Sequence, residues 1–105
     1  MRIQVLPAVA REIEFQDQEL KESIYGALER LEKGEHIPMP LCRPLPKVAR
    51  GLYELRFSSK RGEYRVFYFI RIGTAIYVIH AMQKKSQTIP DRVIDLLKAR
   101  IRGLP

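Results

Sequence analysis

Four cationic side chains fall on or just after three strand-like runs of this sequence, where they are placed to act together on an anionic group. Arg56 lies in "GLYELRF" and Arg65 in "EYRVFYFIR", while Lys84 and Lys85 closely follow "TAIYVIHAM". Arginine and lysine bind phosphate oxygens and stabilise the charge that builds on them during a reaction. The spacing therefore predicts a cationic cluster if the three runs pair in one sheet.

Side chains alternate between the two faces of a strand, so the pattern assigns a face to each arginine. In the first run Tyr53, Leu55 and Phe57 share a face that we expect to be core. Arg56 then stands on the opposite face, in the middle of the strand. Arg65 stands among aromatic residues in the second run. Pairing of the two runs would place Arg56 and Arg65 directly or diagonally opposite each other.

Each of these cations also has a simpler interpretation. Arg56 can form a surface ion pair with Glu54 or Glu63, which contributes less than about 1 kcal/mol to stability. Lys84 and Lys85 can protect the end of a strand against aggregation. The functional interpretation depends on the combination, because four cations converge where only these two acids stand nearby.

Aromatic and polar side chains surround the four cations. Aromatic rings stack on unpaired bases and cations hold the backbone phosphates, so the combination predicts contacts with nucleic acid. The candidate RNA-binding residues are Arg50, Tyr53, Lys60, Arg61, Tyr64, Tyr68 and Gln87. The net charge of +7 agrees with a polyanionic partner. Residues 1–35 carry five basic and eight acidic side chains, a balance of −3, whereas residues 36–105 carry fourteen and four, a balance of +10.

His80 lies in the third run, between Ile79 and Ala81, and its position allows two roles. One is a partly buried histidine whose hydrogen bonds are satisfied. The other is an acid or base, if the ring shares a face with Met82 and Lys84. The candidate catalytic residues are therefore Arg56, Arg65, Lys84, Lys85 and His80.

We expect no cofactor and no metal site. Cys42 is the only cysteine and lies in a proline-rich stretch; it is either a buried or idle thiol, or a nucleophile activated by Arg43. Histidines, cysteines and carboxylates do not follow metal-ligand spacing, and no glycine-rich phosphate loop occurs. The lack of an apolar run of roughly 20 residues and of a signal-peptide pattern favours a cytoplasmic protein without a membrane span.

The elements that position these residues predict a single α+β domain over residues 1–105. A short strand is expected over 2–6, followed by a helix that Pro7 opens. A second helix is expected over 17–33, where apolar residues form one stripe at helical spacing. The proline-rich segment 36–50 reads as an ordered connector without regular structure.

Three strands are expected next, over 51–57, 63–71 and 74–82, with short connections that include Ile72–Gly73. They predict a small antiparallel sheet, a three-stranded meander to which the N-terminal strand adds as a possible edge. From Pro90 onward, apolar residues recur at helical spacing and predict a C-terminal helix. We expect the helices to pack on one face of the sheet.

The order of these motifs resembles the phage-derived, HigB-like branch of the RelE toxin superfamily, which belongs to bacterial type II toxin–antitoxin systems. The resemblance covers about residues 51–102 and implies a RelE-like fold. It also implies an mRNA endonuclease that acts on messages in the ribosomal A site. The matching residues are Gly51, Leu52, Glu54, Leu55, Arg56, Tyr64, Arg65, Val66, Lys84, Lys85, Ser86, Gln87 and Pro90.

The reaction implied by the resemblance needs no metal. The ribose 2′-hydroxyl attacks the adjacent phosphate and leaves a 2′,3′-cyclic phosphate and a free 5′-hydroxyl. We assign charge stabilisation to Arg56 and Arg65. Lys84 or Lys85 would serve as base or acid, because neighbouring cations lower the pKa of a lysine. The family also implies an antitoxin partner, often a helix-turn-helix DNA-binding protein.

Two departures from the family pattern leave a second interpretation open. Glu54 stands near positions where RelE itself carries lysines, and the chain ends in "RIRGLP" without the terminal tyrosine or histidine of several relatives. Tyr64, Tyr68 or His80 would have to substitute. The alternative is a catalytically weak or inactive RNA- or protein-binding module on the same fold.

Overall fold

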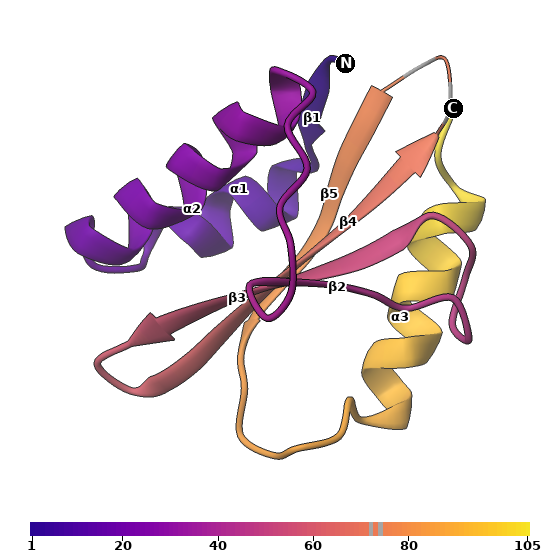
Figure 1. The fold of residues 1–105 in the computed structure, drawn as a ribbon. Coiled ribbons are helices and arrows are strands. Elements are labelled where there is room, and N and C mark those ends of the chain that lie inside the picture. Colours follow the sequence, from indigo (N-terminus) through magenta and orange to yellow (C-terminus); the bar gives the residue numbers. More distant parts are fainter. Residues whose placement is uncertain (72, 74) are drawn as a thin grey trace.

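A computed structural model describes residues 1–71, 73 and 75–105. Its described residues form one mixed sheet of five strands in the order β1-β5-β4-β3-β2, with helices at both ends of the chain (Figure 1). The α+β prediction is confirmed. The strands are β1 (Ile3–Val5), β2 (Cys42–Pro44), β3 (Leu52–Ser59), β4 (Gly62–Arg71) and β5 (Ala75–Gln83), and the helices are α1 (Pro7–Glu14), α2 (Gln18–Glu32) and α3 (Asp91–Arg102).

The expected meander forms the centre of the sheet. β3 pairs antiparallel with β4, and β4 pairs antiparallel with β5. The N-terminal strand is present as expected, and it lies parallel to β5 at one edge, with Ile3 opposite Ile76. The connection expected at Ile72–Gly73 falls partly outside the described residues, because Ile72 is not among them.

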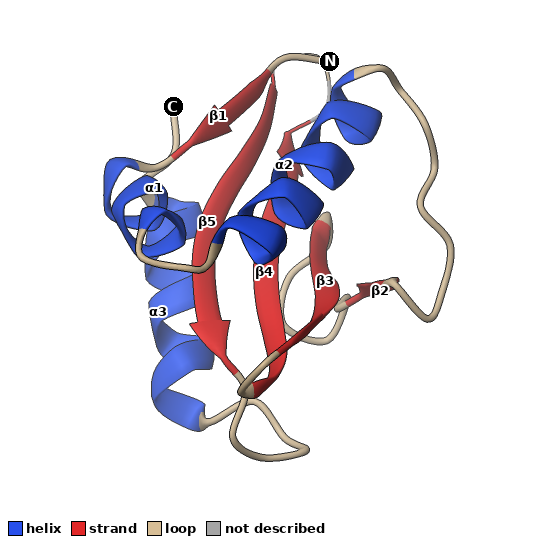
Figure 2. Cartoon of the chain, turned by 90° about the vertical axis from the view of Figure 1, so that its left-hand side faces the viewer, coloured by secondary structure: helices blue, strands red, loops and turns tan. Residues whose placement is uncertain are grey.

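The helices cover both faces of the sheet, so the expectation that they share one face is wrong. α1 and α2 lie on one face and α3 crosses the other (Figures 1 and 2). Two separate clusters of buried residues result, one around Val66 and Tyr68 beneath α1 and α2, the other between the sheet and α3, around Phe67 of β4 and Val93 of α3. The reason is visible in the central strand, where successive residues are apolar, because a strand that is apolar on both faces needs a cover on each.

Local signals explain where the helices begin. Pro7 opens α1, in keeping with the preference of proline for the first turn of a helix. The Asp17 carboxylate caps α2 by accepting a hydrogen bond from the Leu20 backbone N–H at 2.9 Å. The apolar stripe of α2 is buried as predicted. None of the described helices combines the length and apolar character needed to cross a membrane.

The proline-rich connector contains a strand that the sequence did not predict. β2 pairs antiparallel with β3, with Cys42 opposite Leu55 and Pro44 opposite Tyr53. Proline is tolerated there because β2 is an edge strand. The Cys42 side chain is buried, with its Sγ 3.2 Å from the Oη of Tyr68. Burial raises the pKa of the Cys42 thiol, which leaves it protonated and unreactive.

Candidate functional site

Arg56 and Arg65 are cross-strand partners in the β3–β4 ladder, as the sequence predicted. The same register places Glu54 opposite Phe67, one step along the face that α3 covers. Side chains at i and i+2 of a strand share a face. Glu54, Arg56, Arg65 and Phe67 therefore stand together on one surface of the sheet.

Glu54 is the centre of the charge network on this surface. Its side chain is 0% exposed, and its Oε1 accepts hydrogen bonds from three arginines. The Arg65 Nη1 donates at 2.5 Å, and the Arg43 Nη2 and Arg56 Nε each donate at 3.4 Å. The ion pair of Arg56 that the simpler interpretation expects thus exists, but its acid is buried rather than on the surface.

Arg65 is held from two sides. Its Nη2 donates to the Oε1 of Glu63 at 2.6 Å, while Nη1 is bound to Glu54. The Arg65 side chain is only 2% exposed, whereas Glu63 is half exposed. The bond from Arg65 lowers the pKa of Glu63. Both terminal nitrogens of Arg65 are therefore occupied by carboxylates.

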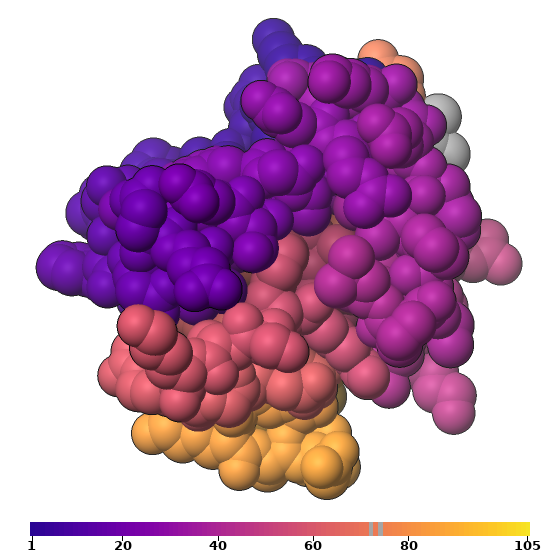
Figure 3. Space-filling model, turned by 60° about the vertical axis from the view of Figure 1, so that its left-hand side comes forward, coloured from indigo at the N-terminus to yellow at the C-terminus, as the bar shows by residue number. Residues whose placement is uncertain are grey.

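Lys84 joins this network where β5 ends. Its backbone N–H donates to the Glu63 carbonyl oxygen at 2.8 Å, which holds the end of β5 beside the start of β4. Partial burial of the side chain lowers the pKa of Lys84, and the positive charge of Arg65 adds to the effect. Lys85 is exposed. The space-filling view in Figure 3 shows the tip of the β3–β4 hairpin and the orange segment after β5 side by side on the surface.

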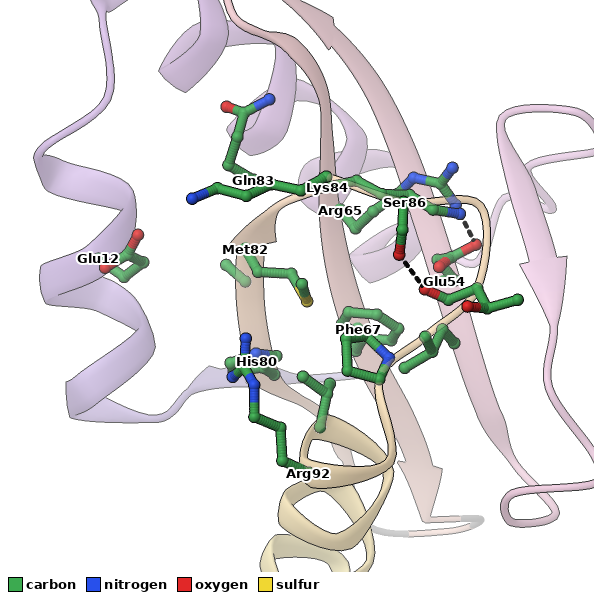
Figure 4. Close-up of a pocket in the computed structure, with 16 residues that line it drawn as sticks. Glu12, Glu54, Arg65, Phe67, His80, Met82, Gln83, Lys84, Ser86 and Arg92 are labelled. Atoms are coloured by element: carbon green, nitrogen blue, oxygen red, sulfur yellow. Dashed lines mark hydrogen bonds and ion pairs between the residues drawn. The ribbon is translucent and has the colours of Figure 1, made fainter.

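A cavity of 350 Å³ opens between this corner of the sheet and the start of α3 (Figure 4). The segment 84–90, which links β5 to α3, forms one of its walls. The cavity is lined by two acidic residues, Glu12 and Glu54, and by four cationic residues, so positive charge predominates. The cations that line it are Arg65, Lys84, Lys85 and Arg92, and His80 and Met82 line it from β5.

His80 lies on the same face of the sheet as Met82 and Lys84. This is the arrangement in which His80 was expected to be able to act as an acid or base. The imidazole stacks on Phe67, with ring centroids 5.8 Å apart. The Arg100 Nη1 lies 3.4 Å from the Nδ1 of His80 and donates to the Ile79 carbonyl oxygen at 2.6 Å. Burial, together with the positive charges of Arg100 and Arg92, lowers the pKa of His80 to about 4. The ring is therefore neutral at pH 7.

Two of the tyrosines that we expected to contact RNA lie in the core. Tyr64 and Tyr68 are buried beneath α1 and α2, on the face opposite the cavity, and burial raises the pKa of both phenols. A base cannot stack on either ring in this arrangement. Tyr53 is half-buried and stacks on Tyr68 at 5.2 Å.

The other four expected RNA contacts are exposed, and none of them lines the cavity. Lys60 and Arg61 lie at the β3–β4 turn, and Gln87 lies in the segment between β5 and α3. Arg50 lies before β3, at the far end of that strand from this turn. The structure thus brings Arg65, Lys84, Lys85 and His80 together at the cavity, joins Arg56 to them only through the shared Glu54, and leaves Arg50 apart.

Sequence reasoning missed two arginines near the cavity. Arg92 lines it from the first turn of α3, and Arg43 contacts Glu54 from β2. The available signal for Arg92 is its position two residues after Pro90, in the first turn of the helix that follows the basic end of β5. Arg43 had none, because β2 itself was not predicted. No group of three metal-ligating side chains occurs among the described residues.

Comparison with known proteins gives one family. The family described as phage derived protein Gp49-like (DUF891) matches residues 11–102, most of the chain. No curated protein matches the sequence significantly. The matched range runs from α1 through the last turn of α3. It contains every residue that lines the cavity. The chain belongs to the phage-derived Gp49-like family.

Proposed function

We propose that the protein is the toxin component of a type II toxin–antitoxin system, a ribosome-dependent mRNA endonuclease of the cytoplasm. The observation that carries this proposal is the convergence of Arg65, Lys84, Lys85 and Arg92 on one cavity of 350 Å³. An RNA phosphate needs such preorganised positive charge when it is cleaved. The Gp49-like family assignment and the resemblance to HigB-like toxins support the same conclusion.

The proposed chemistry uses side chains of the cavity. The ribose 2′-oxygen forms a bond to the adjacent phosphorus while the bond from phosphorus to the 5′-oxygen breaks. The products are a 2′,3′-cyclic phosphate and a 5′-hydroxyl. Lys84 takes the proton of the 2′-hydroxyl, because its lowered pKa makes a neutral amine more accessible than in an ordinary lysine.

The remaining cations stabilise the phosphate and the leaving oxygen. Arg56 is partly exposed and bound only loosely to Glu54, at 3.4 Å, so its guanidinium is available to a phosphate oxygen. Lys85 is exposed at the rim and supplies a proton to the departing 5′-oxygen. The buried Arg65 adds positive charge from the floor of the cavity. It contacts the phosphate directly once Glu63 releases the Arg65 guanidinium.

A cognate antitoxin is part of this proposal. A basic cavity that cleaves messages has to be blocked in a resting cell, and the HigB-like resemblance implies a helix-turn-helix protein as the partner. The basic corner around Lys84 and Lys85 is a surface that an acidic antitoxin segment would cover.

A second candidate function rests on one specific observation. Both terminal nitrogens of Arg65 are bound by carboxylates, at 2.5 Å to Glu54 and 2.6 Å to Glu63. An arginine that is neutralised in this way positions the sheet without touching a phosphate. The alternative is therefore a non-catalytic RNA- or protein-binding module that uses the exposed cations as a docking surface.

Primer extension on mRNA from cells after brief induction separates the two functions. The endonuclease gives discrete new 5′ ends inside translated codons, and these ends accept a phosphate from polynucleotide kinase because they carry a 5′-hydroxyl. The same message with its start codon removed should show no such ends. Lys84→Ala should abolish cleavage, whereas Lys98→Ala, a change on the exposed surface of α3, should leave it intact. Growth arrest without new ends would support the binding module.

A further inference from the structure

The interior of the cavity is apolar and aromatic beneath its cationic rim. Phe67 and Val93 are each only 1% exposed and lie deepest. Met82 and Ile89 are half-buried and line the reachable part. Figure 4 shows Met82 beside His80 and Phe67, with Arg92 approaching from α3. A purely phosphate-binding site does not need such an interior.

The His80 ring is held in a fixed orientation by contacts with two side chains. Phe67 stacks against it, and Arg100 contacts its Nδ1. An arginine has no acceptor, so Nδ1 accepts the hydrogen bond and the proton of the neutral ring sits on Nε2. Because the pKa of His80 is about 4, the ring is uncharged at pH 7 and is only a weak base. A rigid, flat and neutral ring is suited to stacking.

The cavity combines this interior with anion-binding groups and has a limited size. Lys84 and Arg92 line the same space, and the N-terminus of the twelve-residue helix α3 meets it at Pro90. A volume of 350 Å³ is at the lower end of the ~300–1,000 Å³ typical of small-molecule sites. An apolar slot with cations at its mouth fits one flat heterocycle that carries a phosphate.

We infer that the cavity binds one unpaired nucleobase of RNA, with the base against His80 and Met82 and its phosphate on Arg92, beside Lys84. The inference rests on the proposed function in so far as RNA is the ligand. It assigns His80 to recognition of the base and removes it from proton transfer. Single-stranded RNA is recognised in general by stacking of splayed bases on flat side chains.

Nuclear magnetic resonance of the methionine methyl groups and histidine rings tests the inference without any need for cleavage. The chain has three methionines and two histidines, and Met39 and His36 are exposed sites away from the cavity that serve as internal controls. The four nucleoside 5′-monophosphates should shift the signals of Met82 and His80. Ribose 5-phosphate, which lacks the base, should leave both unchanged. Equal shifts with ribose 5-phosphate, or at Met39 and His36, would overturn the inference.

Two variants of His80 separate a platform from a reacting group. His80→Phe keeps a flat ring and should retain nucleotide affinity, whereas His80→Ala should weaken it by about tenfold, within the range for loss of one stacking contact. Met82→Ala, at a half-buried position, provides a second test and should weaken binding in the same direction. Equal losses in His80→Phe and His80→Ala, with both variants folded by circular dichroism, would contradict the stacking role.

The source of the nucleotide and the proposed function are tested separately. A short unstructured RNA should bind at least about tenfold more tightly than a mononucleotide, because further phosphates meet further cations. Equal affinities would identify a free nucleotide as the ligand and refute the RNA assignment. Base-dependent binding by a wild-type protein that cleaves no RNA would refute the proposed endonuclease activity but not the base-binding site. Cleavage of RNA without a response of the His80 or Met82 signals to any base would refute the base-binding site but not the endonuclease activity.

Discussion

Arg65 and Glu54 form a buried ion pair in the middle of the sheet, with the Nη1 of Arg65 2.5 Å from the Oε1 of Glu54 and the side chains 2% and 0% exposed. Such a pair is costly to break, because removal of one partner leaves the other buried charge with only more exposed partners, Arg43 and Arg56 for Glu54 and Glu63 for Arg65. A loss of activity in Arg65→Ala therefore does not distinguish a catalytic arginine from a structural one. The contribution of this ion pair to the free energy of unfolding therefore has to be measured before the activity of Arg65 variants is interpreted.

We expect Arg65→Met and Glu54→Met each to lower the free energy of unfolding by at most about 3–5 kcal/mol, because the remaining ion-pair partners compensate part of the buried charge. The double variant should lose much less than the sum, because it leaves neither charge buried alone. Urea denaturation of the four proteins in a double-mutant cycle measures this coupling. Additive losses would show that Arg43 and Arg56 hold Glu54 equally well without Arg65.

The second carboxylate on Arg65 leads to a prediction about activity. Glu63 is half exposed and competes with an incoming phosphate for the Nη2 of Arg65. Glu63→Gln should therefore raise RNA affinity and the cleavage rate by about two- to fivefold, the range expected when a partly exposed ion pair is released.

Glu35→Gln is the matched control for that variant. Glu35 forms an exposed ion pair with Arg30 at 3.2 Å, and its substitution changes the net charge by the same amount. The cleavage rate of this control should stay at the wild-type level. If both variants gained equally, net charge would explain the effect, and if Glu63→Gln lost activity, Glu63 would be needed to position Arg65.

Periodicity accounts for the parts of the fold that the sequence predicted. The alternation around Arg56 and Arg65 established the shared face, and the helical stripe that contains Ile24 predicted α2. Further along β4 the residues on both faces are apolar, and this pattern indicates the second apolar face, which α3 covers. Phe67 belongs to that face, and beside Arg65 its aromatic type alone does not distinguish a core residue from one that surrounds a cationic site.

The remaining differences come from tertiary contacts that no local pattern records. β2 exists because β3 offers an open edge to Cys42–Pro44. Glu54 became the centre of the network because Arg43, Arg56 and Arg65 approach it from three strands. Tyr64 and Tyr68 resemble base-stacking residues in type, and only the packing of α1 and α2 shows that they are buried.

The assignment of Lys84 as the base predicts a specific effect of a conservative change. Lys84→Arg keeps the positive charge and should keep RNA binding, but arginine cannot give up its proton. Cleavage should fall by about 100-fold or more, the usual contribution of a general base. Wild-type cleavage should increase with pH toward the lowered pKa of Lys84, since only the neutral amine accepts the proton.

Lys98→Arg is the control for this variant because Lys98 is exposed on α3 and does not line the cavity. Single-turnover cleavage of an mRNA on purified ribosomes, measured between pH 6 and about pH 9, gives both the rate and its pH dependence. Cleavage by Lys84→Arg at the wild-type rate would exclude Lys84 as the base.

The burial of His80 predicts how the stability of the fold depends on pH. The pKa is about 4 in the folded protein and 6.5 in the unfolded chain, where burial and the charges of Arg92 and Arg100 no longer act. Between these values the unfolded chain binds more protons than the folded protein, so stability falls as the pH is lowered from 6.5 to 4. With allowance for the remaining contact of the ring with water, the loss is about 2 kcal/mol.

His80→Phe isolates this contribution, because the variant keeps the ring against Phe67 and removes the titration. Carboxylates with lowered pKa values, such as Glu63, also cost stability in acid, but they do so in both proteins and cancel in the difference. We therefore expect the unfolding free energies of wild type and His80→Phe, measured in urea, to diverge progressively below pH 6.5. Parallel curves down to pH 4 would mean that the folded protein accepts a proton on His80 as readily as the unfolded chain. The ring would then be more open to water than the cavity allows, and its assignment as a neutral platform for a base would lose its physical basis.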